Sequence, residues 1–123
     1  MKIKQLATLF IGVLMIGMVS CEYVTIQPKD VVIPDAPVSF KTDVEPIFTQ
    51  LNCTQCHPAL HQPDLAVNKA YASLTSLNMV DTQNPAGSKL MQYINAGHNT
   101  AANMTGTQKA LILKWITEGA KNN

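Results

Sequence analysis

From residue 39 onward, apolar residues recur at the three- and four-residue spacing of α-helices, and no segment alternates as a half-buried strand does. The last helix is the clearest, beginning after Thr105 or Thr107 and ending at Gly119. Its expected buried face consists of Leu111, Ile112, Trp115 and Ile116. The pattern predicts an all-α fold.

The first helix is expected to open at Thr42 or Asp43, whose side-chain oxygens can cap free N–H groups, with Glu45 placed as in a capping box. It is predicted to run as far as Cys53, and Pro46 falls in its first turn, where the missing N–H costs little. Its buried face is expected to hold Val44, Ile47, Phe48 and Leu51.

Two shorter helices are predicted between these. One covers about residues 68–76, with Tyr71 and Leu74 facing inward. The other covers about 86–96, where Leu90, Met91 and Ile94 share a face and Gly97 follows as the stop signal.

Residues 1–20 have the layout of an export signal: a basic start at Lys2 and Lys4, then an apolar stretch over 6–19. That stretch has fourteen residues, whereas a membrane span needs about 20. The run from Met18 to Cys21 resembles the lipobox of bacterial lipoproteins. This resemblance implies cleavage before Cys21 and lipidation of that cysteine.

Residues 21–38 are predicted to be the lipidated N-terminus and an extended linker, because Pro28, Pro34 and Pro37 interrupt every possible helix. An edge strand or a wrap that packs the apolar residues of this segment on the domain is the alternative. The compact domain is expected to cover 39–123.

Without the leader, residues 21–123 form a chain of 103 residues, which is one domain in size. Loss of Lys2 and Lys4 from the nine basic residues leaves seven lysines against eight acidic side chains, a formal charge of −1. This balance excludes a nucleic-acid partner.

Cys53-Thr54-Gln55-Cys56-His57 is typical of covalent c-type haem attachment. The two thiols can form thioether bonds with one porphyrin, and the adjacent imidazole can bind its iron. A redox dithiol is disfavoured, since the surrounding prolines do not fit a βαβ unit. A structural zinc would need two more ligands, from among His57, His61 and His98 at irregular spacing.

The cysteine count fits the haem interpretation. The chain has three cysteines, an odd number that is awkward for disulfides in an oxidising compartment. Lipidation of Cys21 and attachment at Cys53 and Cys56 use all three, so no thiol is left over.

The chain resembles the class I cytochrome c domains of bacterial lipoproteins of the Bacteroidetes type. The resemblance covers about residues 39–121 and lies in the opening from Phe40 to Phe48, the haem motif, a late loop methionine and the ending Trp115-Ile116-Thr117-Glu118-Gly119-Ala120. It implies three to five helices around one covalently attached haem c. The first and last helices would pack together and bring the faces of Phe48 and Trp115 into contact.

The same resemblance implies the iron ligands. His57 is the expected proximal ligand. Met104, which lies in the loop before the last helix, is the expected distal ligand, whereas Met91 belongs to a helix face and Met79 lies too early in the chain. His98 is the main competitor for the distal position, and an open iron is the remaining alternative.

With both axial positions filled, the expected function is a monohaem cytochrome that carries single electrons between redox proteins, with no small-molecule substrate and no enzymatic turnover. It would be lipid-anchored to a bacterial membrane and face the periplasm or the cell surface. The alternatives are a five-coordinate haem sensor or peroxidase-like domain, and a structural zinc module.

A domain of this size, rich in Asn, Thr and Gln, buries little apolar area without a cofactor. We therefore expect a Cys53→Ala/Cys56→Ala variant, which cannot attach haem, to be largely unfolded. Thermal unfolding followed by circular dichroism measures this, and a cooperative, native-like transition would contradict it.

Overall fold

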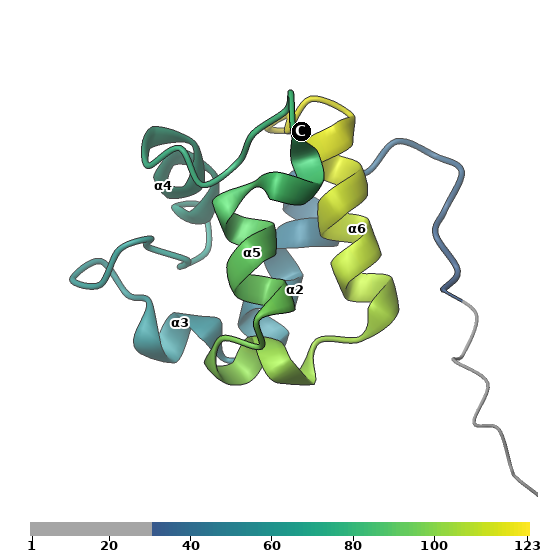
Figure 1. Cartoon of the computed structure of the whole chain (residues 1–123). Coiled ribbons are helices and arrows are strands. Elements are labelled where there is room, and N and C mark those ends of the chain that lie inside the picture. The colour runs from purple at the N-terminus through teal and green to yellow at the C-terminus, as the bar shows by residue number, and fades with distance from the viewer. Residues whose placement is uncertain (1–30) are drawn as a thin grey trace, which may run out of the picture.

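The computed structural model describes residues 31–123, and every regular element in this range is helical. The predicted all-α class is therefore confirmed for these residues (Figure 1). The elements, in chain order, are η1 (Phe40–Val44), α2 (Glu45–Gln50), α3 (Cys53–Cys56), α4 (Ala70–Ser76), η2 (Pro85–Gly87), α5 (Lys89–Asn95), η3 (Asn99–Asn103) and α6 (Gly106–Thr117). The predicted signal peptide and the lipidation site at Cys21 lie outside the described residues.

The first helix begins earlier than its sequence predicts. Ser39 is its cap: the Ser39 hydroxyl accepts from the Thr42 N–H at 3.3 Å, and the Asp43 carboxylate accepts from the Ser39 N–H at 2.8 Å. Five residues with π-helical geometry, η1, then lead directly into α2. Glu45 is not a capping residue. Its buried carboxylate instead accepts the N–H of Asn68 at 2.7 Å and so holds the segment that leads to α4.

The two middle helices are close to their predicted positions. In α4, Leu74 is fully buried as expected, and Tyr71 is half-buried against the core. The helix expected over 86–96 is divided into η2 and α5 at Ser88, whose backbone is extended (φ −53°, ψ 140°) and whose buried hydroxyl accepts the N–H of Asp81 at 2.8 Å. Gly97 follows α5 with a φ of +71°, a left-handed conformation that suits glycine, and so ends the helix as predicted.

The last helix follows its sequence signals closely. Thr105 and Gln108 form a complete capping box at the start of α6, and Gly119, with a φ of +100°, lies just beyond its end. Ile112, Trp115 and Ile116 are almost completely buried along one face. This face supplies one side of the core.

Aromatic packing joins the start of the domain to α6. The ring centroids of Phe40 and Trp115 lie 4.9 Å apart, and Tyr71 from α4 meets Phe40 edge-on at 5.4 Å. The first and last helices therefore pack together, but through η1 and Phe40. Phe48 and Trp115, whose faces were expected to come together, belong to the same core cluster, but the aromatic pair found is that of Phe40 with Trp115, and Phe48 also lines a cavity.

Backbone hydrogen bonds strengthen the same junction. The Asn123 carbonyl accepts from the Lys41 N–H at 3.0 Å and from the Ser39 hydroxyl at 2.6 Å, and the Asn123 side chain accepts the Phe40 N–H at 3.1 Å. Trp115 donates its indole N–H to the carbonyl of Lys121 at 2.8 Å. The segment after α6 thus closes over the first turn of η1.

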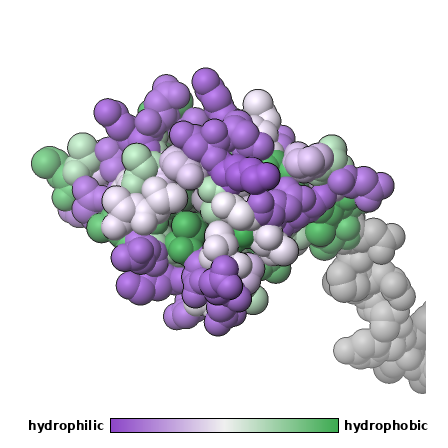
Figure 2. All heavy atoms as spheres, turned by 90° about the horizontal axis from the view of Figure 1, so that it is seen from above, coloured by the Kyte–Doolittle hydropathy of each residue, from purple (hydrophilic) through white to green (hydrophobic). Residues whose placement is uncertain are grey.

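Residues 31–38 are extended and lie along α6. Lys114 donates to the carbonyls of Pro34 and Ala36, and the Glu118 carboxylate accepts the N–H of the buried Val38 at 2.8 Å. The extended form is common to the linker and to its alternative, a wrap on the domain, and the bonds to α6 are those expected of the wrap. The bounds of the linker stay a prediction. Val31, Val32 and Ile33 remain exposed, and Figure 2 shows hydrophobic atoms gathered beside the grey N-terminal residues. Across residues 31–123 no helix is both long and apolar enough to cross a bilayer.

Phe40 offers a test of the junction. Phe40→Ala should lower the free energy of unfolding by about 3–5 kcal/mol, because it leaves a cavity beside Trp115. Phe40→Leu, which keeps most of the volume, should cost only about 1–2 kcal/mol. Urea denaturation followed by circular dichroism compares the two variants with the wild type, and equal losses in both would contradict the packing described.

Candidate functional site

The two cysteines of the Cys-x-x-Cys-His motif lie on one turn of helix. The sequence predicts a first helix that continues to Cys53, whereas α2 ends at Gln50 and α3 starts separately. Asn52 makes the break with a left-handed backbone (φ 54°, ψ 27°), which asparagine tolerates better than most residues. Because residues i and i+3 share a helix face, the thiols of Cys53 and Cys56 point to the same side.

His57 directly follows this turn. Its N–H donates to the Cys53 carbonyl at 3.0 Å, and its own carbonyl accepts the N–H of Leu65 at 2.9 Å, so both sides of the residue are fixed. Its backbone (φ −119°, ψ 55°) leaves helical geometry, as expected for a residue before proline. In residues 31–123 the His57 Nδ1 atom is the single buried side-chain nitrogen or oxygen that lacks a hydrogen-bond partner.

A cavity of about 500 Å³ opens beside this turn. Cys53, Cys56 and His57 line it, and most of the remaining surface is apolar and comes from α2, α5 and η3 and from the loops on either side of α4. Its size is within the range of about 300–1,000 Å³ typical of cofactor and ligand sites. The cavity therefore brings the Cys-x-x-Cys-His motif together with a mostly apolar wall.

The expected distal ligand also reaches the cavity. Met104 lies in extended backbone between η3 and α6, is buried, and lines the cavity wall. His98 lines the cavity too, but it is exposed at the rim, with its ring centroid 6.0 Å from that of His57. Met79, which the sequence analysis set aside because of its place in the chain, is half-buried and also faces the cavity. Met91 is buried in the core and does not line it, as expected.

Sequence reasoning missed several residues around the cysteines. Thr100 Oγ1 lies 3.7 Å from Cys53 Sγ, and Asn99 Nδ2 lies 3.7 Å from Cys56 Sγ, so residues of η3 contact both sulfurs. Lys89 and Tyr93, on α5, also line the cavity. The four-residue spacing of Lys89 and Tyr93, beside the buried Leu90, was the available signal that both lie on one face.

The donor set does not resemble a structural zinc site. Across residues 31–123, no three His, Cys, Asp or Glu side chains lie close enough together to hold a metal ion. His61 is exposed and does not line the cavity. A zinc module of the Cys₂His₂ kind would need such a group.

The same residues fit a covalently attached haem. Two free thiols on one helical turn can reach two vinyl groups, and the apolar wall suits the faces of a porphyrin. The unpartnered nitrogen of His57 leaves this imidazole with bonding capacity that the polypeptide does not use. This capacity would be used if one ring nitrogen of His57 bound the iron and the other donated a hydrogen bond.

Comparison of the whole chain with protein-family models, with curated proteins and with solved structures finds no match.

Proposed function

We propose that this chain is a monohaem c-type cytochrome that carries single electrons between redox proteins. One observation carries the proposal: the turn that holds Cys53 and Cys56 and the imidazole of His57 line one mostly apolar cavity of about 500 Å³. Met104 is buried in the wall of that cavity. Thiols, imidazole and thioether are the groups that covalent attachment and axial ligation of haem require.

The residues around the cavity suit electron transfer better than substrate turnover. Bound haem would supply a one-electron Fe(III)/Fe(II) couple. His57 and Met104 would fill both axial positions, which leaves no site for a substrate or oxygen, and a thioether ligand favours the ferrous form relative to a second histidine. The leucines and other apolar side chains of the wall would limit contact between water and a bound haem, which would place much of the change in charge at the iron in a medium of low polarity.

The linker supports the remaining part of the proposal, a cytochrome tethered to a bacterial membrane through Cys21 and facing the periplasm or the cell surface. Residues 34–38 are bonded to α6, and in Figure 1 this segment and α3 lie on opposite sides of that helix. A lipid at Cys21 would then hold the domain from the side opposite to Cys53 and Cys56. The motif would stay accessible to a redox partner.

Visible and near-infrared spectra of the full protein, produced in a bacterial host that attaches haem to exported proteins, test the ligand set. We expect the oxidised wild type to show the sulfur-to-iron charge-transfer band near the red end of the spectrum. Met104→Ala should abolish this band and lower the reduction potential, because the thioether that favours Fe(II) is lost. His98→Ala and Met79→Ala are the matched controls and should retain the band.

Three outcomes would contradict this assignment. Loss of the band in Met79→Ala, with Met104→Ala unchanged, would move the distal ligand to Met79, and an unchanged Met104→Ala spectrum together with an altered His98→Ala spectrum would move it to His98. A strong spectral shift of the reduced wild type with carbon monoxide would indicate an open iron. That result would favour a five-coordinate sensor or peroxidase-like domain over an electron carrier.

A further inference from the structure

Lys89 is the one cavity-lining side chain in residues 31–123 that carries a formal charge when the histidines are neutral. It has no carboxylate partner in this part of the chain, where the ion pair found is that of Lys114 with Glu118 on α6. The Lys89 side chain is exposed, so its ammonium remains hydrated at the rim of a mostly apolar cavity. The cavity therefore offers one free cation to whatever binds there.

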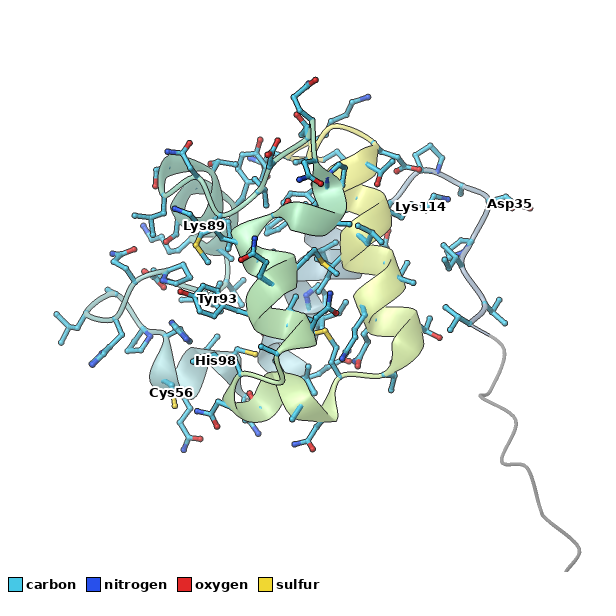
Figure 3. The ribbon with its side chains drawn as sticks, in the orientation of Figure 1. Asp35, Cys56, Lys89, Tyr93, His98 and Lys114 are labelled. Atoms are coloured by element: carbon cyan, nitrogen blue, oxygen red, sulfur yellow. The ribbon has the colours of Figure 1, made fainter. Side chains whose placement is uncertain are left out.

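The position of Lys89 relative to the cysteines is well defined. Lys89 is the first residue of α5, whereas His98 follows the other end of this helix and approaches His57. The seven residues of α5 span roughly 10 Å at about 1.5 Å per residue. Figure 3 shows Lys89, Tyr93, His98 and Cys56 in this order along one side of α5. Lys89 thus lies at the end of the cavity away from the cysteines.

Helix stability does not explain a lysine at this position. The positive end of the helix dipole lies at the first turn, where a cation is unfavourable. Lys89 occupies this turn of α5 without an acidic neighbour in the helix, whose sequence is Lys-Leu-Met-Gln-Tyr-Ile-Asn. A ligand in the cavity is a better explanation, since Lys89 and Tyr93 share the face that lines it.

The chemistry of haem supplies the matching anion. A haem carries its two vinyl groups on neighbouring pyrrole rings and its two propionates on the other two, so thioether bonds at one edge direct the carboxylates toward the opposite edge. We propose that Lys89 binds a haem propionate and thereby fixes the orientation of the carboxylate edge in the cavity. This inference rests on the proposed function, because it requires haem attached at Cys53 and Cys56.

The ion pair would also affect the iron. A propionate carboxylate is a negative charge near the haem and favours the ferric state, and a lysine paired with it offsets this effect. Removal of the Lys89 ammonium should therefore stabilise Fe(III). Reduction potential and propionate vibrations report the interaction independently of any activity.

The test compares Lys89→Met, Lys89→Arg and Lys69→Met in the full haem-loaded protein. Lys69 is the matched control, because it is also exposed and does not line the cavity. Lys89→Met should shift the propionate bending band in the resonance Raman spectrum to lower frequency and lower the reduction potential. Lys89→Arg should retain both wild-type values, and Lys69→Met should leave the propionate band unchanged.

The outcomes separate this inference from the proposed function. Covalent haem in all four proteins, with the same propionate band in Lys89→Met as in the wild type, would overturn the role of Lys89 and leave the cytochrome proposal standing. Equal shifts in Lys89→Met and Lys69→Met would also overturn it, since they would reflect general charge alone. A wild-type protein that carries no haem would overturn both.

Discussion

The packing of η1 against α6 is the interaction on which the rest of the structure depends. Phe40 and Trp115 meet at 4.9 Å. The Asn123 carbonyl accepts from Ser39 and Lys41, on either side of Phe40, and the Asn123 side chain accepts the N–H of Phe40 itself. The two ends of the domain are thereby joined. The segments between these two ends, from α3 to η3, pack on the core with one side. Their other side lines a cavity of about 500 Å³.

This arrangement explains how a small domain can present a sizeable apolar cavity. One set of buried side chains, from η1, α4 and α6, forms a core that includes the aromatic cluster of Phe40, Tyr71 and Trp115. Phe48, Leu90 and Ile94 belong to the same core cluster but also border the cavity. A planar apolar cofactor would therefore extend an existing core, and burial of both its faces would add to the hydrophobic stabilisation of the domain. Single-turn α3 is held mainly by its neighbours, because four residues cannot form a stable helix alone.

The sequence predicted much of the fold because several elements carry strong local signals. The cap at Thr105, one of the two threonines that the sequence offers, and the stop signals at Gly97 and Gly119 are where the sequence places them, since these depend on residues close in the chain. The start of the first helix was misplaced because Glu45, a good capping residue by its spacing, is bound instead to a segment more than twenty residues away. The cavity wall could be predicted only in part. Met104 was expected there. Met79 and Lys89 reach the wall through the way α4 and α5 pack in the fold, which the periodicity of the sequence does not encode. The export signal over residues 1–20 and the lipidation of Cys21 stay predictions.

The proposed function depends on a permanent bond between the polypeptide and a haem at Cys53 and Cys56. The most direct measurement is the mass of the full exported protein after denaturation and extraction with acidified acetone. Covalent attachment predicts that the mass of one haem remains on the polypeptide and that a peptide containing both Cys53 and Cys56 carries it. Release of the colour into the acetone, or a mass that matches amino acids and lipid alone, would contradict it.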